Sequence, residues 1–163
     1  MFLMRRPKIY LDTSVISYLD HTDSPEKRAD TLKFWAYLKM GAGKIDILVS
    51  EVTMREIERN REPKLSKLKS YLSEIEYQIV EESDEIKKVA QMFIKANLLT
   101  EKSYDDCVHI ASSLVHDCTC IVSWNFKHIV NIKMVNGVKL IAAQTGYGVA
   151  TFICNPSYFV EGI

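Results

Sequence analysis

Acidic side chains follow several apolar segments of the sequence, at positions where a carboxylate is hard to explain as a packing residue. The apolar run "KIYL" ends at Asp12, and "KIDILVS" is followed by Glu51 and then by Glu56. Asp106 opens the segment "DCVHIASSLV", and Asn125 follows the apolar run "CTCIVSW". Carboxylates that converge raise one another's pKa unless a cation neutralises them. Oxygen ligands favour Mg²⁺ or Mn²⁺ over zinc, so these residues indicate a possible site for one of these ions.

Helix capping is the alternative explanation for each acid. One of the two hydroxyl residues after Asp12 could cap a following helix, and "TMRE" fits a capping box with Thr53 as N-cap and Glu56 reaching back. "SYDD" fits the same box with Asp106 in third position. Capping does not explain why Asp12 ends an apolar strand that should be central. The helical wheel also places Asp106, and not Asp105, at the edge of the apolar stripe of its helix.

The order of elements predicts where these side chains meet. Strands are expected at 8–11, 44–50, 77–82, 118–125 and 149–154. Helices are expected at 24–41, 52–60, 64–75, 83–99, 103–117 and in the second half of 131–148. Strands that are apolar throughout and alternate with helices indicate an α/β fold, with a parallel central sheet flanked by helices. Ligands bind such sheets beyond the carboxyl ends of the strands, where the acids stand.

Composition is that of an ordinary globular chain. Its 163 residues predict a single domain over 1–163, and its zero formal net charge gives no whole-molecule attraction to nucleic acid. The four cysteines lack zinc-ligand spacing, so we expect them buried and reduced. No segment has the length of a membrane span or the pattern of a signal peptide, so we expect a cytoplasmic protein without membrane contact.

Four motifs in order resemble the signatures of the PIN domain family, in its small, VapC-like toxin type. They are "IYLDTSVIS", "LVSEVTMREI", "DDCVHIASSLVHDCTCIVSWNFKHI" and "FICNPSYFV", which together span nearly the whole chain. The resemblance implies a three-layer PIN-like fold and a Mg²⁺- or Mn²⁺-dependent endoribonuclease. The acids of the family fall on Asp12, Glu56 and Asp106, which would hold the metal. The fourth catalytic position falls on Asn125, where the family commonly has Asp in a "TxDxD" stretch, and the second Asp of that stretch falls on Lys127.

The resemblance also implies a mechanism and partners. The metal would activate a water and neutralise charge on an RNA phosphodiester, with Glu56 as a candidate general base. Glu51 is a rival for the role of second acid, and Ser14 and Ser123 are expected to hydrogen-bond the carboxylates. RNA is the implied substrate, an antitoxin protein the implied partner, and a homodimer the implied assembly.

Histidines are not required by this mechanism. We therefore expect His109 to be a packed helix residue and His128 to fix the loop after Asn125. A basic segment runs from Arg55 to Lys69 and could hold RNA phosphates or simply face solvent. Among the aromatic residues near the site, Phe126 is the candidate for stacking on a base.

Two other functions compete with a nuclease. Because Asn125 and Lys127 replace acids, the chain could be a catalytically weak or inactive PIN-like module that binds RNA or protein. A phosphatase-like hydrolase with Asp12 as nucleophile is a further alternative, although Ser14 stands where a second Asp would be expected.

Overall fold

Five parallel strands form the centre of the molecule in the computed structural model, which describes residues 5–160. Their spatial order is β3-β2-β1-β4-β5, so the first strand of the chain is the middle strand of the sheet. The strands are β1 (Lys8–Leu11), β2 (Asp46–Ser50), β3 (Gln78–Val80), β4 (Cys120–Val122) and β5 (Phe152–Cys154). The predicted parallel α/β sheet is confirmed.

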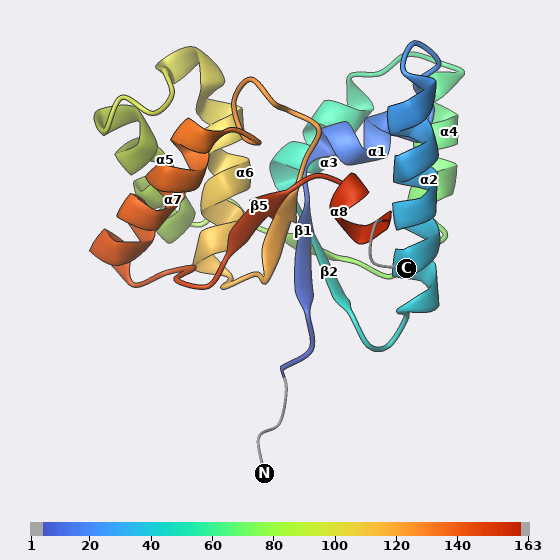
Figure 1. Cartoon of the computed structure of the whole chain (residues 1–163). Helices are drawn as coiled ribbons and strands as arrows, with labels where there is room; N and C mark the ends of the chain where they lie inside the picture. Colours follow the sequence, from blue (N-terminus) through green and yellow to red (C-terminus); the bar gives the residue numbers. More distant parts are fainter. Residues whose placement is uncertain (1–4, 161–163) are drawn as a thin grey trace.

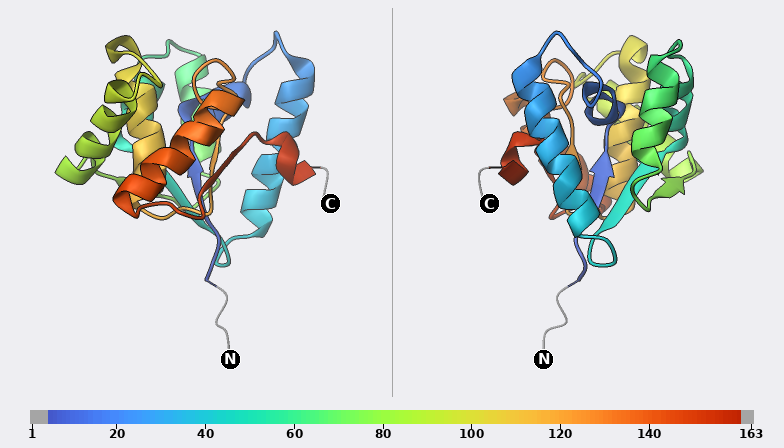
Figure 2. Two further views of the ribbon diagram at one scale, coloured as in Figure 1. Left: turned by 60° about the vertical axis from the view of Figure 1, so that its left-hand side comes forward. Right: turned by 90° about the vertical axis from the view of Figure 1, so that its right-hand side faces the viewer.

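Helices cover both faces of the sheet and complete three layers (Figure 1, Figure 2). One face carries α5 (Asp84–Lys95), α6 (Tyr104–Val115) and α7 (Ile132–Thr145). The other face carries α1 (Thr13–Tyr18), α2 (Pro25–Met40), α4 (Lys64–Leu72) and α8 (Ser157–Val160). Helix α3 (Glu51–Glu58) follows β2 directly and contributes to both hydrophobic clusters, and the short 3-10 helix η1 (Glu101–Ser103) precedes α6.

Alternation along the central strands divides the core into two clusters. In β1, Tyr10 belongs to the cluster beneath α5, α6 and α7, whereas Ile9 and Leu11 belong to the cluster on the opposite face. The same alternation occurs in β2 and β4, because successive side chains of a strand point to opposite faces. A strand buried on both faces has no polar position, which explains the continuous apolar runs.

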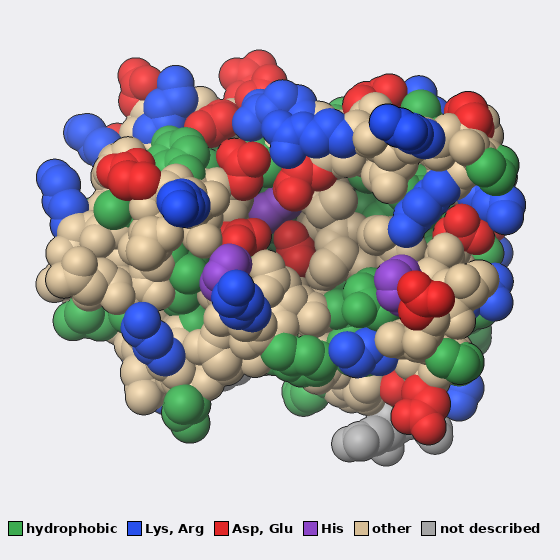
Figure 3. Space-filling model, turned by 90° about the horizontal axis from the view of Figure 1, so that it is seen from above, with side chains coloured by type: hydrophobic (Ala, Val, Ile, Leu, Met, Phe, Trp, Pro, Cys, Tyr) green, Lys and Arg blue, Asp and Glu red, His purple; other side chains and the backbone are tan. Residues whose placement is uncertain are grey.

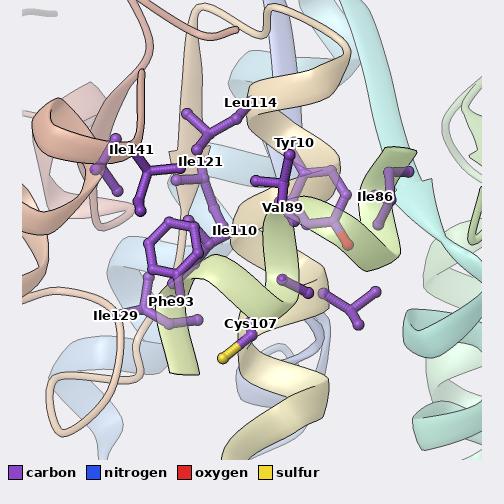
Figure 4. Packing of buried hydrophobic residues seen from close by; sticks show 14 of the residues in the cluster. Tyr10, Ile86, Val89, Phe93, Cys107, Ile110, Leu114, Ile121, Ile129 and Ile141 are labelled. Atoms are coloured by element: carbon purple, nitrogen blue, oxygen red, sulfur yellow. The ribbon is translucent and has the colours of Figure 1, made fainter. Parts of the chain in front are cut away.

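Helix α6 is the most deeply buried helix, with every residue from Cys107 to Leu114 inside. Ile110 and Leu114 pack with Phe93 of α5 and Tyr10 of the sheet (Figure 4). A helix packed on all sides has a fixed position, so polar side chains on its first turns are held firmly over the sheet.

All four cysteines are free and buried, as the sequence predicted. Burial raises the pKa of Cys107 and of Cys118 to about 12, so both remain thiols at neutral pH. No helix within residues 5–160 is long and apolar enough to cross a membrane.

The largest differences from the predicted elements lie at their ends. Strand β4 stops at Val122, three residues before the predicted end, because the Ser123 hydroxyl donates to Asp12 and accepts from the backbone N–H of Asn125. Helix α7 runs over the whole of Ile132–Thr145 and not only its second half, since the Asn131 side chain caps it by accepting from Met134 N.

Candidate functional site

The carboxyl ends of the three inner strands bring Asp12, Ser50 and Ser123 to one side of the sheet. Each lies two residues beyond a strand residue that packs beneath α6: Tyr10, Leu48 or Ile121. Because side chains repeat every two residues along extended backbone, the three polar groups are directed to the same layer. All three are buried. The strand-end position that marked Asp12 in the sequence therefore places it under α6.

Asp12 is held by hydroxyl groups from two segments. Ser14 Oγ and Ser123 Oγ donate to Asp12 Oδ2 at 2.6 and 2.7 Å, as predicted for these serines. The other oxygen, Asp12 Oδ1, lies 3.4 Å from His109 Nε2. Asp12 precedes α1 but makes no side-chain cap, so its carboxylate serves the site and not the helix end.

Glu56 of α3 reaches the same histidine from the opposite direction. Its Oε1 lies 2.6 Å from His109 Nε2 and accepts a hydrogen bond from Thr13 Oγ1 at 3.0 Å. The capping alternative for Glu56 is wrong, because α3 begins three residues earlier, where Ser50 and Thr53 form the capping box. Helix capping thus leaves the Glu56 carboxylate available.

Glu51 points elsewhere. It is exposed, and its Oε2 accepts from the backbone N–H of Glu82 at 2.8 Å, beyond the end of β3. Of the two candidates for the second acid, only Glu56 contacts His109, which also lies beside Asp12.

His109 is almost completely buried and balances both acids, with a side-chain exposure of 1%. Tyr10 OH donates to Ser50 Oγ at 2.8 Å, so it accepts from His109 Nδ1–H at 2.7 Å, while Nε2–H faces Glu56. Burial alone would lower the pKa of His109, but Tyr10, Asp12 and Glu56 together hold it well above its usual range. We call Asp12, Glu56 and His109 the inner cluster. In it the imidazolium supplies the positive charge.

The Glu56 carboxyl responds to the same contact. Burial acts to raise its pKa, but the hydrogen bond and charge of His109, with help from Thr13 and Arg59, leave the pKa below its usual value. Glu56 is therefore ionised at neutral pH.

Asp106 forms a second acid–histidine contact, which we call the outer pair. Its Oδ2 lies 2.7 Å from His128 Nδ1, and the two side chains are 22% and 28% exposed. Burial and the charge of Asp12 raise the pKa of Asp106 above its usual value, although hydrogen bonding to His128 acts against this rise. The predicted cap at the start of α6 is not formed, since the N-cap Ser103 makes no side-chain hydrogen bond to the helix.

Asn125 joins the outer pair to the loop after β4. Its amide Nδ2 donates to Asp106 Oδ1 at 3.3 Å, and its Oδ1 accepts from the backbone N–H of His128 at 3.0 Å. The predicted loop-fixing role of His128 is thus present in its backbone, while its ring contacts an acid. Asn125 positions Asp106, and Lys127 is exposed beside it.

The donor chemistry of the site fits a divalent cation. Asp12 Oδ1 has only the long contact to His109, and Asp106, one helical turn before His109, is close enough for Asp12 to raise its pKa. Oxygen donors from Asp12, Glu56 and Asp106 are those that Mg²⁺ or Mn²⁺ prefers. Between residues 5 and 160, however, no three His, Cys, Asp or Glu side chains are already arranged as a ligand set. Instead, His109 lies beside Asp12 and Glu56, and His128 contacts Asp106.

Basic residues border the acidic hollow. Figure 3 looks onto the carboxyl ends of the strands and shows acidic and histidine side chains in a depression, with Lys and Arg side chains along one side. Within the predicted basic segment, Arg59 is near enough to lower the pKa of Glu56. Three other members form ion pairs: Arg55 with Glu82, Lys67 with Asp20 and Lys69 with Glu58. Much of the segment is therefore neutralised locally.

Sequence reasoning missed the histidines and Tyr10 as members of the site. His109 was expected to be only a packed residue, and Tyr10 stood inside an apolar strand. Two signals were available: His109 follows Asp106 by three residues on one helix face, and Tyr10 precedes Asp12 by two on one strand face.

Comparisons of the chain with a family model and with solved structures each found a match. No curated protein matches the chain in sequence. The structure is similar to one described as VapBC2 from Rickettsia felis bound to a DNA fragment from their promoter. That similarity has a TM-score of 0.56 at 16% identity and covers 91% of this chain and 98% of the other. The PIN domain family model matches residues 9–127, which include β1, the acids at the strand ends and Asn125. The chain therefore belongs to the PIN domain family.

Proposed function

We propose that the protein is a Mg²⁺- or Mn²⁺-dependent endoribonuclease. The observation that carries the proposal is the convergence of Asp12 and Glu56 on one point, 3.4 and 2.6 Å from His109 Nε2, with Asp106 one turn away. Asp12 directly follows β1, Glu56 belongs to α3 and Asp106 belongs to α6, and no local capping role explains their convergence.

Asp12, Glu56 and Asp106 would hold the ion. A bound divalent cation supplies charge neutralisation for a phosphodiester and lowers the pKa of a water. Ser14 and Ser123 orient Asp12 by fixing one of its oxygens, which leaves the other for the ion. Asn125 orients Asp106 by donating to its Oδ1, while Asp106 Oδ2 contacts His128. Glu56, ionised and held by Thr13, is the candidate proton acceptor.

The proposal extends to the biological setting. We propose that the chain is the toxin of a toxin–antitoxin pair, because the solved structure that it resembles is a VapBC2 assembly. An antitoxin protein would be its partner, a homodimer its assembly and the cytoplasm its location, with residues 1–163 forming one domain.

Cleavage of labelled single-stranded RNA tests the activity. Wild-type protein with Mn²⁺ should cut the RNA, and both EDTA and Asp12→Asn should reduce the rate by at least about 100-fold, as expected when a metal ligand is lost. Asp106→Asn should behave like Asp12→Asn, whereas the matched control Asp105→Asn should retain the rate. RNA that stays intact with wild-type protein and Mn²⁺ would refute the nuclease.

A binding module without cleavage is the second candidate. It is favoured by His109 and His128, which already neutralise the acids, and by Asn125 and Lys127 in place of acidic residues. Under this alternative, RNA or a partner protein binds equally well to wild type and to Asp12→Asn, and no product forms at any Mn²⁺ concentration.

A further inference from the structure

A pocket of about 440 Å³ lies beside the outer pair and is not used by the proposed chemistry. His128 lines this pocket and also contacts Asp106, and Ser103, three residues before Asp106, lines it as well. The volume falls within the roughly 300–1,000 Å³ of small-ligand sites. A group bound in it would therefore lie next to a phosphate placed at the acids.

The lining combines apolar surface with a few polar groups. Phe126 is 44% exposed and Ile132 is 81% exposed, and both line the pocket with the partly buried Leu98. Thr100 and Ser103 bring hydroxyl groups to the same walls. An aromatic ring with nearby hydrogen-bonding groups matches the needs of a flat, polar-edged heterocycle such as a nucleobase.

The charge of the lining favours an anionic ligand. Lys127, Lys133 and His128 line the pocket, and none of its lining residues is acidic. A pocket of about 900 Å³ at the opposite end of the strands differs, because its basic lining residues are offset by acidic ones: Arg6, Lys8 and Lys39 by Asp46, Glu74 and Glu76. A base carried on a phosphate backbone suits the pocket beside the acids and not the remote one.

Neighbouring side chains contact the aromatic wall and the backbone that carries it. Lys27 Nζ lies 4.9 Å from the centre of the Phe126 ring, which also meets the buried Trp124 edge-on at 6.0 Å. Asn131 Nδ2 donates to the backbone carbonyls of Phe126 and Lys127 at 3.0 and 3.1 Å. A ring that is already fixed loses little conformational entropy on binding, which favours recognition.

We propose that this pocket is a nucleobase subsite, in which Phe126 stacks on the base of a single-stranded RNA nucleotide next to the cleaved bond while Lys127 contacts its phosphate. The inference rests on the proposed nuclease function. It assigns to Phe126 a role in substrate binding that is separate from the acids.

Binding of RNA without metal tests the pocket independently of cleavage. Fluorescence anisotropy in EDTA with a labelled single-stranded oligoribonucleotide should show that Phe126→Ala weakens binding by about tenfold, the size of one base–aromatic stack. Phe126→Trp should retain affinity, while Phe126→Leu should lose it, because leucine keeps apolar contact but cannot stack. Phe152→Ala is the matched control, since Phe152 is 37% exposed on β5 and lies outside the lining.

A base-deletion scan locates the nucleotide. With Mn²⁺, an abasic substitution at one position flanking the cut should lower kcat/KM for wild type by about tenfold, and the same RNA should show no further loss with Phe126→Ala. Circular-dichroism melts of the variants check that folding is retained.

The outcomes separate the two proposals. If Phe126→Ala binds and cuts RNA like Phe152→Ala, the subsite is refuted and the nuclease stands. If Phe126→Ala loses affinity for a co-expressed protein partner but not for RNA, the pocket is a protein-binding surface and the inference is also wrong. If wild type binds RNA through Phe126 but never cuts it, the nuclease fails while base recognition survives.

Discussion

The inner cluster and the outer pair both combine carboxylate groups with an imidazole, but in different surroundings. His109 lies between Asp12 and Glu56 with 1% of its side chain exposed, whereas His128 contacts Asp106 with 28% exposed. The inner cluster comes from the end of β1, from α3 and from the buried helix α6, while the outer pair depends on the loop after β4. Burial strengthens the interactions between the charges of the inner cluster, and solvent weakens the corresponding interaction in the outer pair. We therefore expect the inner cluster to contribute to folding stability as well as to function. Substitutions in the outer pair should change stability little.

Removing the inner imidazole should have the largest effect. His109→Leu has a similar volume but leaves two carboxylates without their cation, one of them almost fully buried. Breaking a buried ion pair costs about 3–5 kcal/mol, so the free energy of unfolding in EDTA should fall by about 3 kcal/mol. Urea denaturation measures this change.

A matched control uses His116, the C-cap residue of the same helix. His116 is partly exposed and follows α6, so His116→Leu should change the free energy of unfolding by only about 0.5 kcal/mol. Equal losses in the two variants would show that the inner cluster has no special electrostatic role.

Loss of the Ser123 hydroxyl should have the second-largest effect on stability. Ser123→Ala removes a 2.7 Å hydrogen bond to Asp12 Oδ2 and the acceptor of Asn125 N, and the site is too buried for full solvation. Hydrogen bonds to charged groups contribute about 1.5–3 kcal/mol, so unfolding should be easier by about 2 kcal/mol. Ser113→Ala is the control, because Ser113 is equally buried but bonds only the nearby Ile110 carbonyl. A loss for Ser123→Ala no larger than for this control would contradict the assignment.

The inner cluster also predicts a pH dependence of stability. The pKa of His109 is raised in the folded protein, so its stabilisation is complete below the unfolded pKa of about 6.5. It decreases as the pH rises above that value toward the folded pKa, by at most about 1.4 kcal/mol per pH unit. Chemical denaturation in EDTA between pH 6 and 9 should show this decline in wild type. A decline of the same steepness in His109→Leu would assign it to another group.

The sequence predicted the acids better than their partners, for a physical reason. Asp12 could be found because a carboxylate that ends a doubly buried strand conflicts with its surroundings, and strand order alone places it at the ligand-binding edge. Helix periodicity separated Asp106 from Asp105 in the same way. Tyr10 gave no such conflict, since a tyrosine fits an apolar strand, and its hydrogen bond to His109 depends on the distance between β1 and α6.

The loop after β4 was the least predictable part of the site. Its form depends on Asn131 donating to two backbone carbonyls and on Asn125 accepting from His128 N, and these contacts have no periodic pattern. Composition likewise could not tell which basic residues are neutralised by neighbours. Topology and helix periodicity therefore indicate the acids Asp12, Glu56 and Asp106, whereas the contacts that His109 and His128 make to them require coordinates.

The outer pair should give the smallest change in stability and a distinct change in metal binding. His128→Gln removes a partly exposed contact to Asp106, so the free energy of unfolding should change by less than about 1 kcal/mol. The same change frees an Asp106 oxygen, so the apparent Mn²⁺ affinity, measured by electron paramagnetic resonance of free Mn²⁺, should rise about two- to fivefold. Lys127→Gln is the control, because Lys127 is an exposed cation next to His128 in the sequence. This substitution should change the Mn²⁺ affinity less. A weaker Mn²⁺ affinity in His128→Gln would mean that His128 supports the ion, and the contrast between the two regions would then lie in exposure alone.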